Sequence, residues 1–93
     1  MGLDIGIISI EYLERPRGIA YRFAWELAVE ASAFGYMHGD GNNWGAFSRR
    51  QVRRLLEAFA QQKALTQEQT TEIQSWVNSL PWDGDDIELH FNW

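Results

Sequence analysis

The most constraining feature of this sequence is the segment 17–34, where apolar residues recur with the period of a helix. Its few polar residues stand four apart and share one edge: Arg22, Glu26 and Glu30. The remaining faces carry aliphatic residues, a row of alanines, and an aromatic row that includes Tyr21 and Trp25. A helix with so narrow a polar stripe has to be covered by its own domain or by another chain. We therefore expect a central helix here, ending at Gly35.

Two more helices and two strands are expected around this central helix. Ser48 has the position of an N-cap for a helix over 48–63, and Thr66 with Gln69 has the form of a capping box for a helix over 66–79. Residues 2–12 are rich in isoleucine and residues 87–93 alternate apolar with polar, which is typical of strands. Residues 37–47 are rich in glycine and asparagine and predict a loop.

These elements predict a small α+β domain of β-α-α-α-β order, in which two terminal strands pair and three helices cover them. The 93 residues suit a single compact domain over 1–93. With no cysteine in the chain, disulfides and thiolate metal sites are excluded. No apolar run approaches the roughly 20 residues that span a bilayer, and residues 1–12 lack the basic start of a signal peptide. We expect a cytoplasmic protein that does not contact membranes.

The sequence offers little that could carry catalysis. Its histidines are His38 and His90, and the local pair of His38 with Asp40 falls short of the three or four converging ligands of a metal site. His90 alternates outward on the last predicted strand and is expected to be solvated. There is no nucleophile motif and no glycine-rich phosphate loop between a strand and a helix. We expect a protein that is not an enzyme and has no metal or cofactor.

Charge is distributed unevenly along the chain, whose net charge is −5. Residues 48–66 carry five bases and one acid, whereas residues 67–93 carry six acids and no base. An acidic protein repels phosphate backbones, so direct nucleic-acid binding is not expected. The acidic end either serves solubility alone or attracts a basic partner, because complementary charge speeds encounter.

Five tryptophans are many for a core of this size, and three of them stand where burial is hardest. Trp44 lies in the glycine-rich segment, Trp82 in a turn, and Trp93 at the chain end. Exposed indoles beside charged residues are typical of protein-binding surfaces. Alternatively, these indoles fold back and cover a small core.

The leading hypothesis is a binding module that masks a basic surface on a nucleic-acid-handling protein. In size and charge the chain is similar to small acidic inhibitors such as toxin-immunity proteins and phage anti-defence proteins, which is an analogy rather than a motif. The residues expected to contact the partner are Asp83, Asp85, Asp86, Glu88, Trp82, Trp44 and Trp93.

Two alternatives remain open. The first is a small-ligand or phosphate site at the start of the second helix, where free N–H groups and guanidinium groups would meet an anion. Its residues would be Ser48, Arg49, Arg50, Arg53 and Arg54, unless those arginines pair with the acidic end of the chain. The second is a self-associating module, such as a homodimer, that uses Tyr21, Trp25 and the edges of the strands.

Overall fold

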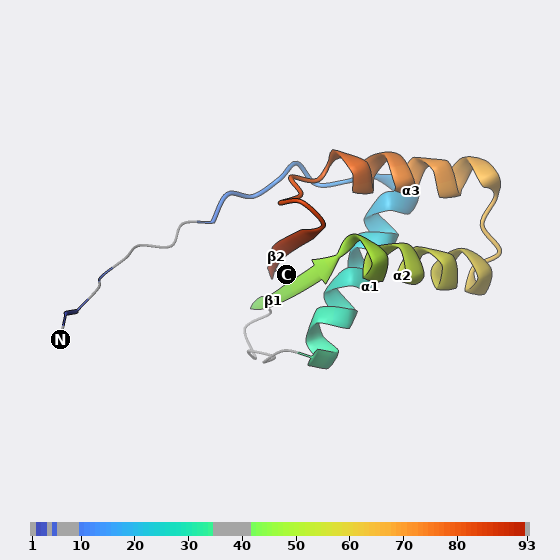
Figure 1. The fold of residues 1–93 in the computed structure, drawn as a ribbon. Helices are drawn as coiled ribbons and strands as arrows, with labels where there is room; N and C mark the ends of the chain where they lie inside the picture. The colour runs from blue at the N-terminus through green and yellow to red at the C-terminus, as the bar shows by residue number, and fades with distance from the viewer. Residues whose placement is uncertain (1, 4, 6–9, 35–41, 93) are drawn as a thin grey trace.

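The computed structural model describes residues 2, 3, 5, 10–34 and 42–92 (Figure 1). The elements follow in the order α1 (Gly18–Phe34), β1 (Asn42–Ser48), α2 (Arg49–Gln62), α3 (Gln67–Ser79) and β2 (Asp86–Asn92). The expected class is confirmed: this is a small α+β fold with three helices and a two-stranded antiparallel sheet.

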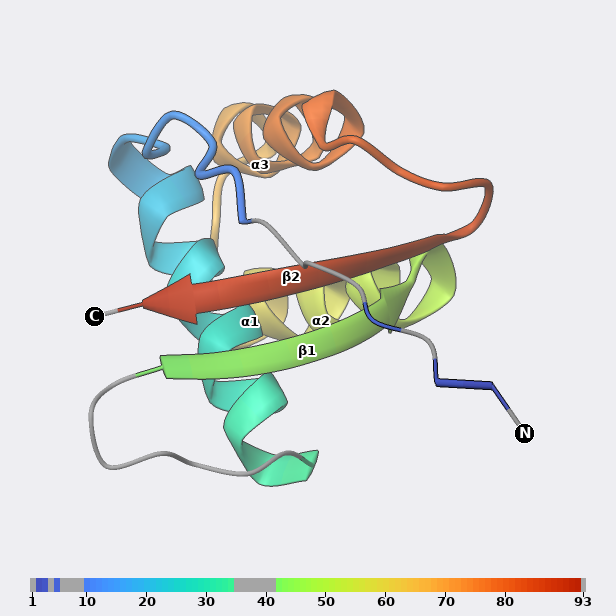
Figure 2. The ribbon, with the colours of Figure 1, turned by 90° about the vertical axis from the view of Figure 1, so that its left-hand side faces the viewer.

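The two strands pair antiparallel along their whole lengths. Trp44 stands opposite His90 and Phe47 opposite Ile87. Phe47 and Ile87 are buried on the inner face, whereas Trp44 lies exposed on the outer face. Figure 2 shows the strands side by side, with α1 and α2 behind them. The helices therefore cover one face of the sheet.

The first strand of the sheet does not lie where the isoleucine-rich segment predicted it. Within residues 2–12, the described positions 2, 3, 5 and 10–12 have no regular secondary structure, and β2 pairs instead with residues 42–48. That segment had been expected to be a loop. Glycine and asparagine weaken the local preference for a strand, but pairing with β2 and packing on α1 outweigh it. The alternation of exposed Trp44 with buried Gly45 is the period of a strand.

The helices begin and end close to their expected bounds. The backbone N–H of Gln51 donates to the Ser48 Oγ over 3.1 Å, and that of Ser48 donates to the Gln51 Oε1 over 2.8 Å. Thr66 and Gln69 make the same reciprocal pair, with distances of 3.1 and 2.9 Å. Both capping boxes satisfy N–H groups that the first helical turn leaves free. Each cap therefore determines where its helix starts.

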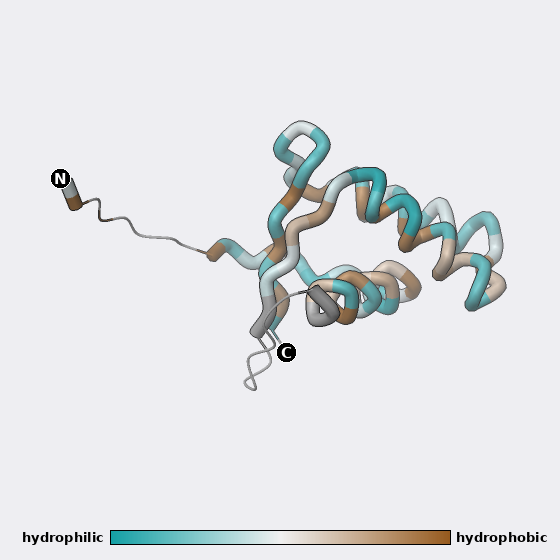
Figure 3. The backbone as a smooth tube through the Cα atoms, turned by 60° about the horizontal axis from the view of Figure 1, so that its bottom comes forward, coloured by the Kyte–Doolittle hydropathy of each residue, from teal (hydrophilic) through white to brown (hydrophobic). Residues whose placement is uncertain are grey.

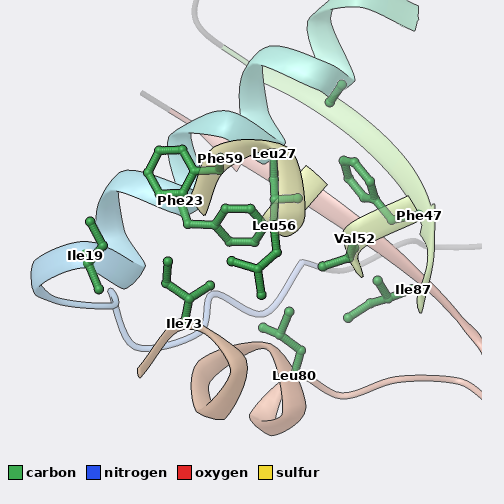
Figure 4. Packing of buried hydrophobic residues seen from close by; sticks show 11 residues of the cluster. Ile19, Phe23, Leu27, Phe47, Val52, Leu56, Phe59, Ile73, Leu80 and Ile87 are labelled. Atoms are coloured by element: carbon green, nitrogen blue, oxygen red, sulfur yellow. The ribbon is translucent and has the colours of Figure 1, made fainter. Parts of the chain in front are cut away.

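One hydrophobic core joins all five elements. Its most deeply buried side chains come from each helix: Phe23 and Leu27 from α1, Val52 from α2 and Ile73 from α3. Figure 4 shows these side chains converging, with Phe47 and Ile87 closing the sheet side. Figure 3 shows brown and teal alternating along the helices, as expected when each helix packs by one side. The core fixes the relative positions of α1, α2 and the sheet.

Candidate functional site

A tight acidic turn connects α3 to β2. The backbone N–H of Asp83 donates to the Asp86 carbonyl over 2.8 Å, and that of Asp86 donates to the Asp83 carbonyl over 3.1 Å. Gly84 has a φ of +62°, which is easy for glycine and costly for other residues at this place in a two-residue turn. Asp83, Asp85 and Asp86 are all exposed. We call residues 83–86 the acidic turn.

Arg49, the first residue of α2, holds the acidic turn against the body of the protein. Its backbone N–H donates to the Asp85 carbonyl over 2.8 Å, and its Nε donates to the Gly84 carbonyl over 3.1 Å. The Nε also lies 3.8 Å from the Asp85 carboxylate, and the guanidinium carbon lies 4.6 Å from the centre of the Trp82 ring. One arginine therefore makes hydrogen bonds and an ion pair with the acidic turn and a cation–π contact with Trp82, the residue before it.

Replacing Arg49 with alanine should loosen the acidic turn. We expect the free energy of unfolding to fall by about 1 kcal/mol, since an exposed cation–π contact and the associated hydrogen bond are each worth about that much or less. Hydrogen exchange at the Asp86 amide should become faster in the variant. Urea denaturation followed by circular dichroism, together with amide exchange by NMR, measures both effects.

Arg53→Ala is the matched control, because the Arg53 side chain is exposed on the same helix and makes no hydrogen bond or ion pair within the described residues. Its stability should stay within about 0.5 kcal/mol of the wild type. Equal effects of the two substitutions would show that Arg49 contributes no more than any surface arginine.

The start of α2 is already occupied by groups of the chain itself. The Arg49 N–H is bonded to Asp85 and the Gln51 N–H to Ser48, so an anion at this helix end would have to displace both contacts. Arg50, Arg53 and Arg54 remain exposed, and within the described part of the chain they have no ion pair. The five residues of the expected anion site thus split into two used internally and three that face solvent.

The tryptophans expected to contact a partner lie in different surroundings. The Trp82 Nε1–H donates to the Val77 carbonyl over 2.8 Å, and its ring is half-buried beneath Arg49 and packed against the core. Trp44 is 43% exposed on the outer face of the sheet. Trp93 lies outside the described residues. Of the two that are described, Trp44 is therefore the more exposed, and Trp82 supports the acidic turn through Arg49.

An aromatic cluster covers part of the outer face of the sheet. The Trp44 and His90 rings lie edge to face with their centres 4.6 Å apart, and the Tyr12 and His90 rings are 6.0 Å apart. The Tyr12 hydroxyl and the His90 Nδ1 are hydrogen-bonded over 3.3 Å. His90 faces outward as expected, but these neighbours leave it half-buried rather than solvated. No local pattern indicates this contact of Tyr12, because its partner is 78 positions away in the sequence.

Beside this cluster lies a groove of about 780 Å³, which we call the aromatic groove. Its walls are β2, the first half of α1, the end of α3 and the chain segment 10–16. Tyr21 and Trp25 lie in it, 37% and 41% exposed, and contact each other edge to face. Trp44 and Glu88 lie in the same lining. Asp83 lines it as well. The structure thus brings the residues expected for self-association next to three of those expected to contact a partner.

The charge of this lining is mainly negative. It holds four carboxylates and one guanidinium group: Glu11, Glu14, Asp83 and Glu88 against Arg15. The acidic turn lies at one end of the same surface, and within the described residues the ion pair of Asp85 with Arg49 is the one made by its carboxylates. The electrostatic field over the groove therefore favours the binding of a positively charged ligand.

Within the described part of the chain, no three acidic or histidine side chains converge as a metal site requires. Among the described helices, none combines the length and the apolar character needed to cross a bilayer. His38 and Asp40 lie outside the described residues. No family model matches the chain, and comparisons with curated proteins and with solved structures gave no match.

Proposed function

We propose that this protein is a non-enzymatic binding module that covers a basic surface on a partner protein, acting as an inhibitor of a partner that handles nucleic acids. The observation that carries this proposal is the exposed set of Asp83, Asp86 and Glu88, which have no ion pair within the described residues. Asp83 and Glu88 line the same groove as Trp44, whose side chain is 43% exposed. Proteins that bind nucleic acids present basic grooves, to which such a surface is complementary in charge.

Each part of the surface has a separate role in this proposal. The carboxylates steer the partner during approach and set the dependence of association on salt. Trp44 supplies apolar area that is removed from water on binding, as interface tryptophans commonly do. Arg49 and Trp82 hold the acidic turn in place and do not contact the partner. The same negative charge keeps the protein away from nucleic acid itself.

The test is a triple charge reversal in the acidic turn: Asp83→Lys, Asp85→Lys and Asp86→Lys. The wild-type protein first captures its partner from extracts of the cells that make it, and stopped-flow fluorescence then follows association with the purified partner. The triple variant should associate more slowly by about tenfold or more at low salt, and its rate should depend less on salt. Circular dichroism verifies that the variant is folded.

A second triple variant keeps the change in net charge but moves it elsewhere. Glu57, Glu68 and Glu72 are exposed on α2 and α3, and their replacement by lysine should slow association much less. Equal rates for the wild type and the acidic-turn variant would contradict the proposal. Equal slowing by both variants would mean that only the total charge matters and that the acidic turn is not the binding site.

A further inference from the structure

The edge of β2 that faces away from β1 carries unpaired backbone groups. The backbone N–H and C=O of Asp86 are both bonded to Asp83. Asp83 lies on one side of Asp86, and Ser48 of β1 lies on the other. In an antiparallel strand the N–H and C=O of one residue point to the same side, and that side alternates along the chain. Glu88 and His90 therefore direct their N–H and C=O groups to this free edge, where segment 10–17 makes no backbone hydrogen bond with them.

The aromatic groove lies beside this free edge. Leu89 and Phe91 from β2 line it, and so do Tyr21 and Trp25 from α1, whose rings are partly exposed. Its volume of about 780 Å³ lies between a strand edge and an apolar helix face. An extended chain placed there would bond to the strand edge and cover the aromatic rings, which is how peptides add to sheets.

The charges that line the groove restrict which extended chain fits it. The lining carries four carboxylates and one guanidinium group, as described above. Glu88 lies on the outer face of β2, whereas Leu89 and Phe91 face inward. Because side chains alternate between the two faces of a strand, an added strand would place every second residue against the aromatic rings and the others near Glu88. Aliphatic residues suit the first set and lysine or arginine the second.

We propose that the aromatic groove binds an extended basic segment of the partner protein, which pairs with the free edge of β2 as a third strand. This inference rests on the proposed function and names how the partner is held. The isoleucine-rich segment of the chain itself is a poorer occupant, because residues 2–10 carry Asp4 and no lysine or arginine. Its carboxylate would approach like charges, which disfavours pairing.

The test uses a synthetic peptide of about eight residues, enough to run the length of β2. It alternates valine with lysine or arginine and has blocked ends. We expect it to bind the whole protein, and we expect amide exchange at Glu88 and His90 to slow by about tenfold or more at saturation, because their N–H groups become hydrogen-bonded. NMR titration and hydrogen exchange measure both.

Two control peptides separate strand addition from attraction between charges. One has the same composition with the valines grouped at one end, and the other carries N-methyl groups on the backbone amides that would face β2. Both should bind more weakly by about tenfold, because the first loses the alternation and the second loses hydrogen bonds to the strand edge. Equal binding by all three peptides, or binding without protection of Glu88 and His90, overturns the proposal.

The remaining outcomes are also decisive. Protection of Glu88 and His90 that grows with protein concentration in the absence of peptide would assign the edge to a second copy of the chain and overturn the proposal. If the acidic-turn variant loses its partner while the alternating peptide fails to bind, the proposed function stands and strand addition is excluded. If the peptide binds and charge reversal leaves partner association unchanged, the groove is a peptide site and the charge-based function fails.

Discussion

Replacing Phe23 with alanine is expected to lower the free energy of unfolding by about 3–5 kcal/mol. The Phe23 side chain is fully buried, and its ring centre lies 5.7 Å from that of Phe59 on α2. Without the ring, folding no longer gains the free energy of moving that apolar area out of water. The substitution also leaves a cavity that the surrounding helices can only partly close. Since small domains are stable by about 5–15 kcal/mol, this loss is a large fraction of the total.

Urea denaturation of the variant and the wild type gives this difference directly. Val29→Ala is the control, because Val29 lies on the same helix and is 61% exposed. Its effect should stay within about 0.5 kcal/mol. If Phe23→Ala were no more destabilising than Val29→Ala, α1 could not be the helix that holds the core together.

Replacing Gly45 with alanine should destabilise the protein by about 1–3 kcal/mol, through overpacking. A Cβ at this position would lie 2.6 Å from a ring carbon of Phe47 and 2.8 Å from the Cβ of Ala31. The expected change in stability has the opposite sign to the usual one, because replacing glycine with alanine inside a strand normally stabilises a protein. The reason is that β1 approaches α1 too closely at Gly45 for any side chain to fit.

A double-mutant cycle identifies the source of this loss. Ala31→Gly opens space on α1, so Gly45→Ala should cost less in that background than in the wild type, with a coupling energy of about 1 kcal/mol. Gly2→Ala is the control, since a Cβ there has no neighbour within 4 Å, and it should leave stability unchanged. Additive effects of Gly45→Ala and Ala31→Gly would mean that the two elements do not touch at this point.

The surface residues show how far the sequence could predict the candidate site. The exposure of Asp83, Asp85 and Asp86 was expected, because carboxylates without nearby bases in the sequence stay in water. The expected roles of the two turn and loop indoles were alike, yet Trp82 is half-buried and bonded to Val77, whereas Trp44 is 43% exposed. Sequence spacing cannot distinguish these two, because the burial of Trp82 also depends on its contact with Arg49, a residue of α2 that is distant in the sequence.

The sequence by itself determined the three helices, their caps and the last strand. The information for these elements is local: a capping box joins residues three apart, as in Ser48 with Gln51, and strand alternation in β2 has a period of two residues. Such patterns predict the local structure without information from distant parts of the chain. The class of the fold followed from them.

Only the tertiary structure decided which segment pairs with β2, where Arg49 points, and that Tyr12 covers His90. Each of these contacts joins residues far apart in the sequence, so its free energy depends on geometry that no local pattern records. Segment 42–48 is a strand because it pairs with β2, and α1 lies so close to it that a side chain at position 45 would clash with Ala31 and Phe47. Residues 2–12 have the stronger local preference for a strand, but their described part has no partner strand in the fold.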